Sequence, residues 1–334
     1  MKKIQEDKLI VLTGGAGFIG SCVLRQLNDL GISNILVVDN LGETDKWKNL
    51  VGKKMAEVIS KENLFAWLED REDEIEAFIH LGACSSTVEK NASYFLENNY
   101  RYTLRLAEYA LKHNHRFIYA SSAATYGDGS LGFVDDHEQL EMLQPMNMYG
   151  YSKHLFDLWA KRQGVLKELV GLKYFNVYGP NEYHKGRMSS AIIRMVPQAL
   201  KTGKITLFKS SDPEKFGDGE QCRDFVYVKD VAKITCGFLQ NTLSGIFNIG
   251  AGVPTTWNQL ARAVIKVLDR SVTLEYIEMP ADLVGSYQNY TCADMSKLKR
   301  EVKQPGSKMN IIPTKLEKAV GEYVGEYLLE GKRW

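Results

Sequence analysis

The stretch "LIVLTGGAGFIGSCVLRQL" at residues 9–27 constrains the fold more than any other part of the chain. A short apolar run is followed by glycines at positions 14, 15, 17 and 20, and then by a helical pattern. Glycines at this spacing permit a tight turn and a close approach of the backbone to a pyrophosphate. The unpaired N–H groups at the start of the helix would face the phosphates. The sequence therefore predicts a dinucleotide-binding strand–turn–helix unit here.

Short apolar runs alternate with longer helical patterns through the first half of the chain. Apolar strands separated by helices are typical of a parallel sheet that is covered on both faces. The expected strands are residues 9–13, 34–39, 77–83, 116–121 and 169–177, and the expected helices are residues 18–30, 93–113 and 148–163. The predicted fold class is α/β, a Rossmann-type doubly wound parallel sheet.

After residue 178 the segments become more varied. The expected elements include a helix at 188–202, a strand-like run at 245–250 and an amphipathic helix near 313–329. We expect an NAD(P)-binding Rossmann domain over residues 1–177 and a smaller mixed α/β substrate-binding lobe mainly over residues 178–334. Segments near 224–250 are expected to return to the first domain.

The composition favours a soluble intracellular protein. A formal net charge of +1 gives no general attraction to nucleic acid or to an anionic membrane. The five cysteines are scattered without a C-x-x-C pair, which argues against a disulfide framework or a zinc ribbon and fits a reducing cytoplasm. No signal peptide is apparent, and no apolar run approaches the ~18 residues of a membrane span. We expect a cytoplasmic protein without a metal site.

Asp39 ends the second expected strand, 19 residues after Gly20, and suits the hydroxyls of an adenosine ribose. A carboxylate at this place favours NAD, whereas NADP would need a nearby cation. Lys46, Lys48 and Lys61 are candidates for that cation, but ordinary surface charge explains each of them at least as well. These residues alone leave the choice between NAD and NADP open.

Tyr149 and Lys153 lie four residues apart at the start of an expected helix and therefore share one face. A nearby ammonium and an oxidised nicotinamide both favour the phenolate of a tyrosine, whose pKa is otherwise near ~10. Lys153 would also hold the nicotinamide ribose. Ser122 ends a strand at the carboxyl edge of the sheet, where it would hydrogen-bond a substrate oxygen. These residues indicate general acid–base catalysis.

Six longer motifs follow the glycine loop in order. They are "LGACSSTVE" (81–89), "ENNYRYT" (97–103), "YASSAATYG" (119–127), "MYGYSKHLFD" (148–157), "YFNVYGPNEYHKGRM" (174–188) and "RDFVYVKDVA" (223–232). With them the chain resembles the extended short-chain dehydrogenase/reductase superfamily over nearly its whole length, and within it the ADP-L-glycero-D-manno-heptose 6-epimerase family. This resemblance implies a homo-oligomer, a pentamer in that family, which acts on an ADP-heptose for the lipopolysaccharide inner core.

The resemblance also assigns roles to residues. Ser122, Tyr149 and Lys153 match the catalytic residues of the superfamily, and Lys185 matches a lysine proposed in this family as a second acid/base. The residues implied at the cofactor are Gly14, Gly17, Phe18, Ile19, Gly20, Asp39, Asn40, Lys46, Lys61, Leu81, Gly82, Ala83, Cys84, Ser85, Asn98, Lys153, Val177 and Lys185. The residues implied at the substrate are Ser122, Asn176, Arg187, Arg194, Phe208, Lys209, Ser210, Ser211, Arg223 and Tyr287.

Lys46 and Lys61 match lysines that the family places around NADP. The resemblance therefore predicts NADP as the cofactor, with NAD as the alternative. Three positions depart from the pattern of the family. Arg187 stands where a serine is expected, Leu81 where an acidic residue is expected, and Arg194 where a histidine is usual. Residues 212–221 resemble an insertion. These departures concern substrate contact and leave the redox residues unchanged.

Inversion at C6 of a heptose calls for oxidation first, because that C–H bond is too weakly acidic for a side chain to remove its proton. Hydride would leave C6, the 6-keto intermediate would turn, and hydride would return to the opposite face. Because the oxygen then approaches from another direction, a second acid/base besides Tyr149 is needed within hydrogen-bond reach. Lys185 is the candidate, although "PNEYHKGRM" by itself would be interpreted as a solvated polar turn.

Two other functions agree with parts of the same sequence. A 4-epimerase or 4,6-dehydratase would act on a UDP, GDP or dTDP sugar. Dehydratases of this superfamily carry an Asp–Glu pair where this chain has Ala123 and Ala124, which argues against dehydration. Lys185 is the residue that distinguishes the 6-epimerase from a 4-epimerase. A non-catalytic NADP-binding regulator would commonly lose the tyrosine–lysine pair, which this chain keeps.

Overall fold

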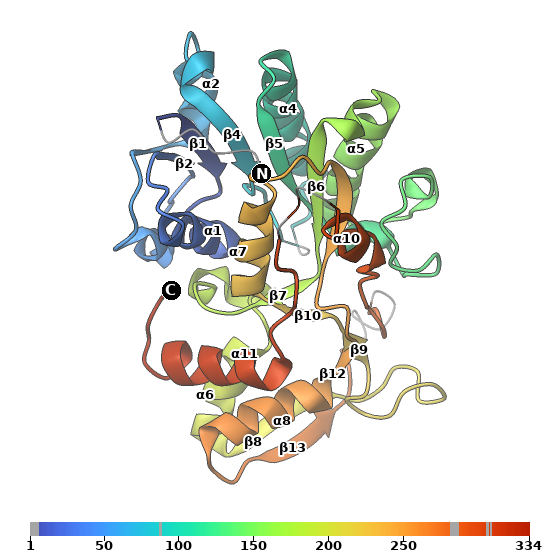
Figure 1. Ribbon diagram of the computed structural model, residues 1–334. Helices are drawn as coiled ribbons and strands as arrows, with labels where there is room; N and C mark the ends of the chain where they lie inside the picture. The colour runs from blue at the N-terminus through green and yellow to red at the C-terminus, as the bar shows by residue number, and fades with distance from the viewer. Residues whose placement is uncertain (1–6, 87–88, 281–286, 305–306, 308) are drawn as a thin grey trace.

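The computed structural model describes residues 7–86, 89–280, 287–304, 307 and 309–334, which are arranged around a seven-stranded sheet (Figure 1). The strands in spatial order are β11 (Gly245–Ile249), β6 (Leu169–Tyr174), β5 (Arg116–Ser122), β4 (Ile75–His80), β1 (Leu9–Thr13), β2 (Ile35–Val38) and β3 (Glu57–Ile59). Neighbouring strands run parallel. The winding direction reverses between β1 and β4, where a doubly wound sheet opens a crevice at its carboxyl edge. The predicted Rossmann-type fold is confirmed.

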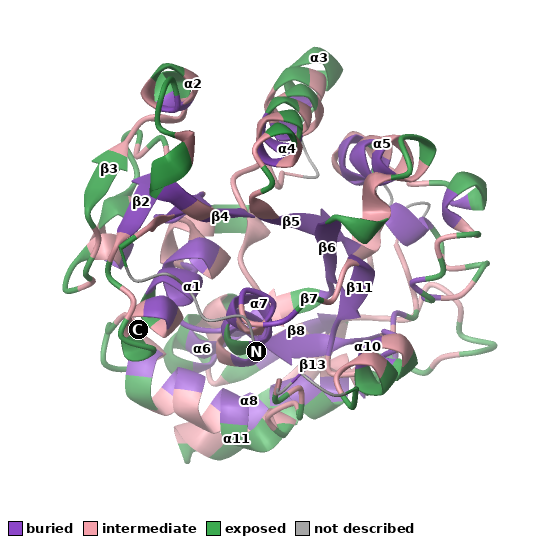
Figure 2. Cartoon of the chain, turned by 45° about the horizontal axis from the view of Figure 1, so that its top comes forward, coloured by how far each residue is buried: buried purple, intermediate pink, exposed green. Residues whose placement is uncertain are grey.

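Helices cover both faces of this sheet (Figure 2). The helices on one face are α1 (Phe18–Asp29) and α7 (Val228–Gly237), and those on the other are α4 (Tyr102–Lys112) and α5 (Met148–Arg162). All four residues of β2 are buried, which explains why the strands appear in the sequence as continuous apolar runs. Shorter helices are α2 (Leu64–Trp67), α3 (Ala92–Phe95) and α10 (Ser296–Glu301).

A second lobe lies below the sheet in Figure 1. It contains α6 (Ile192–Thr202), α8 (Trp257–Leu268), α11 (Leu316–Glu322) and the parallel pair β8 (Lys204–Phe208) and β13 (Thr273–Ile277). Two short strand pairs complete it, β7 (Asn176–Tyr178) with β10 (Phe225–Tyr227) and β9 (Cys222–Arg223) with β12 (Thr255–Thr256). One hydrophobic core runs from Ile10 in the sheet to Leu260 and Tyr323 in the lobe. The division into domains at residue 177 stays a prediction.

Several predicted elements are interrupted or begin later than expected, among them the helix near 313–329, which consists of α11 and then a π-helical stretch. The expected strand 169–177 is divided at Phe175, because β6 pairs in the main sheet whereas β7 pairs with β10. The expected helix 188–202 begins only at Ile192, since Gly186 has a φ of +52° and Ser189 is extended. The expected helix 93–113 consists of α3, a π-helical stretch and α4 in succession.

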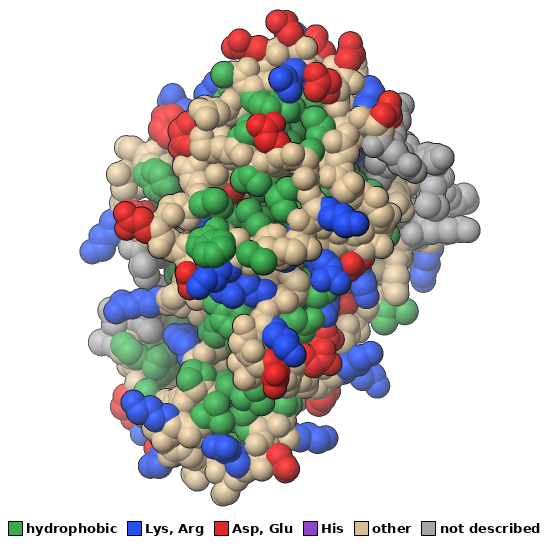
Figure 3. Space-filling view, turned by 90° about the vertical axis from the view of Figure 1, so that its left-hand side faces the viewer, with side chains coloured by type: hydrophobic (Ala, Val, Ile, Leu, Met, Phe, Trp, Pro, Cys, Tyr) green, Lys and Arg blue, Asp and Glu red, His purple; other side chains and the backbone are tan. Residues whose placement is uncertain are grey.

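On the left-hand side of the molecule, acidic and basic side chains are interspersed with apolar ones (Figure 3). Among the described residues, no helix combines the length and apolar character that crossing a bilayer requires. The same residues include no group of three or more His, Cys, Asp or Glu side chains placed to hold a metal ion.

Candidate active site

The glycine loop joins β1 to α1 and leaves space for a phosphate at the start of the helix. Gly14 has a φ of +71°, and a Cβ there would lie 2.6 Å from the backbone nitrogen of Gly82. A Cβ on Gly20 would lie 2.0 Å from the carbonyl oxygen of Gly14, so only glycine allows the turn and the helix to pack this closely. Gly17, which has no side chain to cap the helix, is the N-cap of α1. The first N–H groups of α1 are therefore available to an anion.

A cavity of about 670 Å³ opens beside this loop at the carboxyl edge of the sheet. Its volume falls within the range of about 300–1,000 Å³ that is common for ligand and cofactor sites. The residues of the predicted cofactor set that line it are Gly14, Gly17, Phe18, Ile19, Gly20, Asp39, Lys46, Leu81, Gly82, Ala83, Cys84, Ser85, Lys153, Val177 and Lys185. The other predicted residues in the lining are Ser122, Tyr149, Asn176 and Arg194. Most of the predicted site therefore surrounds one cavity.

An adjoining cavity of about 240 Å³ lies where the adenosine end of a dinucleotide is expected, and its lining includes Asn40, Lys61 and Asn98. The carboxylate of Asp39 accepts hydrogen bonds from the N–H of Ala16 at 2.9 Å and from Nζ of Lys46 at 2.6 Å. Lys61 Nζ donates to Asn98 Oδ1 at 2.5 Å. The structure thus places a cation directly against the acidic residue that the sequence assigned to the ribose.

Tyr149 and Lys153 occupy successive turns at the start of α5. The side chain of Asn147 caps this helix by accepting a bond from the backbone N–H three residues on, at 2.9 Å. Lys153 is only 5% exposed, and its Nζ donates to the carbonyl oxygen of Ala120 at 2.8 Å. Because Ala120 belongs to β5, this bond ties the tyrosine helix to the strand that ends in Ser122.

The environments of these side chains shift their pKa values in opposite directions. Burial raises the pKa of the Tyr149 phenol, and a hydrogen bond with Ser122 opposes that rise. Burial lowers the pKa of Lys153 to about 8, against the attraction of Asp157. A neutral phenol therefore lies on the same helix face as a buried amine whose pKa is about 8. Further positive charge from a bound cofactor would favour the phenolate.

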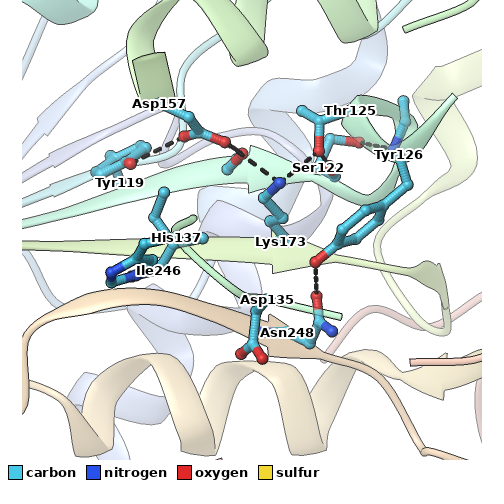
Figure 4. A network of polar contacts seen from close by, with 12 residues as sticks. Tyr119, Ser122, Thr125, Tyr126, Asp135, His137, Asp157, Lys173, Ile246 and Asn248 are labelled. Carbon is cyan, nitrogen blue, oxygen red and sulfur yellow. Dashed lines mark hydrogen bonds and ion pairs between the residues drawn. The ribbon is translucent and has the colours of Figure 1, made fainter. Parts of the chain in front are cut away.

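A buried polar network lies behind this pair (Figure 4). The carboxylate of Asp157 accepts hydrogen bonds from the Tyr119 hydroxyl at 2.9 Å and from the Ser121 hydroxyl at 2.7 Å. Lys173 Nζ donates to Thr125 Oγ1 at 2.8 Å and lies 3.6 Å from the Asp157 carboxylate. Since these residues belong to α5, β5, β6 and the turn after β5, the network fixes the carboxyl end of β5 against the tyrosine helix.

Lys185 reaches the same cavity from a different element. It lies in the turn Tyr183–Met188, which follows β7, and lines the cavity together with Tyr149. Its Nζ is 5.7 Å from the centre of the Phe18 ring, at the start of α1. Burial lowers the pKa of Lys185, and the Glu182 carboxylate opposes this. The structure thus brings two acid–base candidates to one cavity.

Several predicted substrate residues lie outside this lining. Arg187 is exposed. Residues 208–211, at the end of β8 and beyond it, also do not contribute to the lining. The Arg223 guanidinium lies 4.8 Å from the centre of the Tyr287 ring and 5.8 Å from that of Trp257. Because Trp257 lines the cavity, Arg223 and Tyr287 stand immediately behind its wall.

The lining also includes residues that the sequence did not single out. They are Ser86, Ala120, Ser121, Tyr174, Phe175, Met188, Ser189, Ser190, Ala191, Phe225 and Trp257, and His184 of "PNEYHKGRM" lines the cavity beside Lys185. Tyr174 and Phe175 follow from the predicted sheet, because they end a parallel strand at its carboxyl edge. The rings of Phe225 and Trp257 meet edge to face at 5.2 Å. No local pattern marks these two residues, since only the folding of the second lobe brings them to the site.

The doubly wound sheet, the glycine loop and the tyrosine–lysine pair define a nucleotide-binding enzyme of the Rossmann type. The site fits a nicotinamide dinucleotide, because the turn at Gly14 and Gly20 has no space for a Cβ and the helix start offers free N–H groups. The chain matches the model of the NAD dependent epimerase/dehydratase family over residues 10–250. The chain belongs to this family, as its motifs predict.

Relatives within the family narrow the class further. The chain is 47% identical over 323 residues to the ADP-L-glycero-D-manno-heptose-6-epimerase of Nitratidesulfovibrio vulgaris (strain DP4), a match that covers 96% of this chain and 98% of that protein. The structure of ADP-L-glycero-D-manno-heptose-6-epimerase from Helicobacter pylori is similar with a TM-score of 0.80, 27% identity and 98% coverage of both chains. The structure of UDP-N-acetylglucosamine 4-epimerase from Methanobrevibacter ruminantium M1 is similar to that of this chain with a TM-score of 0.78 and 26% identity. The match covers 98% of this chain and 100% of that protein.

Proposed function

We propose that the protein inverts C6 of the heptose in ADP-D-glycero-D-manno-heptose and so forms ADP-L-glycero-D-manno-heptose for the lipopolysaccharide inner core. One observation carries this proposal: Tyr149 and Lys185, which come from different elements, line the same cavity. An epimerase that returns hydride to the opposite face needs acid–base groups on two sides of the reacting carbon. The name of the relative at 47% identity supports the same substrate.

The residues of the chain would divide the proton transfers between them. Tyr149 would exchange the proton of the 6-hydroxyl on one side, while Ser122 orients the phenol and the substrate oxygen. The buried ammonium of Lys153 would favour the phenolate, and its bond to the Ala120 carbonyl holds it in place. A bound nicotinamide would supply the hydride transfer at C6 and end unchanged. Lys185 would exchange the proton on the opposite side, where burial eases the loss of its own proton.

NADP is the cofactor that the charges favour. Asp39 alone would repel the additional phosphate of NADP, but its carboxylate is already paired with Lys46 at 2.6 Å. Lys61 adds a second cation at the adjoining cavity. We therefore propose that Lys46 and Lys61 hold the ribose phosphate of NADP, with NAD as the weaker ligand.

A 4-epimerase acting on a UDP sugar is the second candidate, favoured by the similarity to the 4-epimerase structure at a TM-score of 0.78. Both epimerisations need a second proton-transfer group, so Lys185 separates the two candidates through the resemblance of "PNEYHKGRM" to the ADP-heptose 6-epimerase family. A regulator without turnover has no such need for Tyr149, Lys153 and Lys185 in one cavity. The resemblance further implies a cytoplasmic homo-oligomer, for which we propose the pentamer of the family; sedimentation equilibrium tests this.

The proposed reaction is tested by incubating the purified protein with ADP-D-glycero-D-manno-heptose without added cofactor. Nuclear magnetic resonance at C6 then follows the configuration of the sugar. We expect interconversion of the two epimers, because the cofactor ends each cycle unchanged. Conversion of UDP-galactose in place of the ADP-heptose would support the 4-epimerase and overturn the proposal.

A further inference from the structure

The turn that carries Lys185 is held from a distant part of the chain. Asn181, four residues before Lys185, is fully buried and has a φ of +78°. Its Nδ2 donates to the hydroxyl of Ser21 and to the carbonyl oxygen of Trp334, both at 3.0 Å. Its Oδ1 accepts the N–H of Trp334 at 2.9 Å. The side-chain amide of Asn181 thus connects α1, through Ser21, to Trp334 near the other end of the sequence.

A second buried amide extends this connection to the glycine loop. Asn49 is 1% exposed, and its Nδ2 donates to the carbonyl oxygens of Ala16 and Asn181, both at 3.1 Å. Its Oδ1 accepts a bond from Nε of Arg333 at 3.0 Å. Ala16 belongs to the loop that would hold the pyrophosphate. The side chain of Asn49 therefore connects the segment 332–334 both to the cofactor loop and to the turn before Lys185.

The middle of the turn is fixed by the same segment. The hydroxyl of Tyr183 donates to the carbonyl oxygen of Lys332 at 2.7 Å. The guanidinium of Arg333 lies 5.0 Å from the centre of the Tyr183 ring. In Figure 1 the segment after α11 rises from the second lobe toward α1, which brings it against this turn.

The far side of the turn is anchored by Glu182, which is 1% exposed. Its carboxylate accepts bonds from the N–H of Ser190 at 2.5 Å, from the Ser190 hydroxyl at 2.6 Å and from the hydroxyl of Tyr323 at 2.8 Å. Ser190 lines the cavity, and Tyr323 follows α11. The start of the stretch 181–190 is therefore fixed by residues after position 320, and Glu182 ties Ser190 at its end to that start.

Lys185 is held through its neighbours, since its backbone N–H donates to the carbonyl oxygen of Glu182 at 3.0 Å. Gly186 follows it with a φ of +52°, and a Cβ on that glycine would meet no atom within 4 Å. The ammonium stands over the ring of Phe18 at 5.7 Å. The position of its backbone therefore depends on the bonds made by Asn181 and Glu182.

We propose that Asn181, Asn49 and the segment 332–334 form a positioning brace, which sets the reach of the Lys185 ammonium into the cavity. The brace is built from hydrogen bonds to two buried amides, so it is a defined geometry and not general packing. Misplacement of an acid–base group by about 1 Å costs roughly 100-fold in rate. Loss of the brace should therefore affect the half-reaction that uses Lys185 and spare the half-reaction that uses Tyr149. This inference rests on the proposed function.

The test substitution is Asn181→Gly, in the enzyme with its bound cofactor. Glycine accepts a φ of +78° without strain and removes the bonds of the amide. Asn114→Gly is the matched control, because Asn114 also has a positive φ, of 57°, and lies at the end of α4. Arg333→Met is a second variant that removes the bond to Asn49 and leaves Asn181 intact.

Two readouts separate positioning from a general structural role. In single turnovers, each C6 epimer is mixed separately with the enzyme and reduction of the bound cofactor is followed. We expect Asn181→Gly to slow the oxidation of one epimer by roughly 100-fold. It should be the same epimer whose oxidation Lys185→Met slows. Arg333→Met should slow that epimer in the same direction, and Asn114→Gly should slow neither. Equal slowing of both epimers by Asn181→Gly would overturn the brace.

The second readout does not depend on the reaction. The rate at which an amine-reactive reagent modifies Lys185 is measured by peptide mass spectrometry. We expect it to rise in Asn181→Gly and in Arg333→Met and to stay unchanged in Asn114→Gly. An unchanged rate in the first two variants would contradict the brace. If the wild-type protein converts neither epimer, the proposed function fails, and the modification rates still decide whether Lys185 is held by this segment.

Discussion

Replacing Lys185 by methionine removes the ammonium from the cavity and keeps a long side chain over Phe18. General acid–base catalysis contributes about 10²–10⁴-fold to the rate of a step, which corresponds to roughly 3–5 kcal/mol at 1.36 kcal/mol per tenfold change. Because epimerisation passes through both half-reactions, its overall rate should fall by that full factor. Burial disfavours the charge of Lys185, so a neutral side chain should leave the fold and the bound cofactor intact.

The assay follows the configuration at C6 of ADP-heptose by nuclear magnetic resonance, with circular dichroism and cofactor absorbance as checks on the fold. Lys201→Met is the matched control, because Lys201 is exposed on α6, outside the cavity lining. The control should turn over at the wild-type rate. Turnover near the wild-type rate in Lys185→Met would show that this lysine takes no part in proton transfer.

Three further outcomes are expected. Tyr149→Phe should slow epimerisation by about 10²–10⁴-fold at unchanged cofactor content, in the same assay, and near-normal turnover would remove the phenol from the mechanism. Lys46→Ala should weaken the binding of NADP by about 10–100-fold and that of NAD much less, because a hydrogen bond to a charged group contributes about 1.5–3 kcal/mol. Calorimetry with cofactor-stripped protein measures both affinities, and equal weakening would contradict the role of Lys46 at the ribose phosphate. The pKa of Lys153 falls from 10.5 to about 8 on folding, so between these pH values the unfolded chain binds more protons and the free energy of unfolding rises with pH. Lys153→Met should remove that rise and stabilise the protein at neutral pH by about 3 kcal/mol, at about 1.36 kcal/mol for each pKa unit. Urea titrations at several pH values measure this, and an unchanged pH dependence would contradict the buried charge.

The central part of the fold could be predicted because its signals are local. The strand–turn–helix at Gly14–Gly20 and the apolar runs of the parallel strands each lie within one short stretch of sequence. β8 and β13 were not predicted, since both are short and only partly buried and they pair across more than sixty residues. The interruption at Phe175 depends on the pairing of β7 with β10, which no local pattern announces.

The site follows the same division. Tyr149 and Lys153 were found from their spacing on one helix, whereas Lys185 was found through the resemblance of "PNEYHKGRM" to a family motif. Asp39 alone favoured NAD, and only the structure places Lys46 against its carboxylate. Trp257 carries no sequence signal, because its contact with the site depends on the packing of the second lobe. Chemistry concentrated in one element can be recognised in sequence, and chemistry assembled from several elements needs the fold.

The central claim is that C6 is oxidised and reduced by the same bound nicotinamide while Tyr149 and Lys185 move only the hydroxyl proton. The most direct measurement uses ADP-D-glycero-D-manno-heptose carrying deuterium at C6, incubated with the protein in ordinary water. We expect an inverted product that retains the deuterium at C6, because hydride leaves and returns without exchange with solvent. Inversion with loss of the label to water would contradict it, since the C6 hydrogen would then have been removed as a proton.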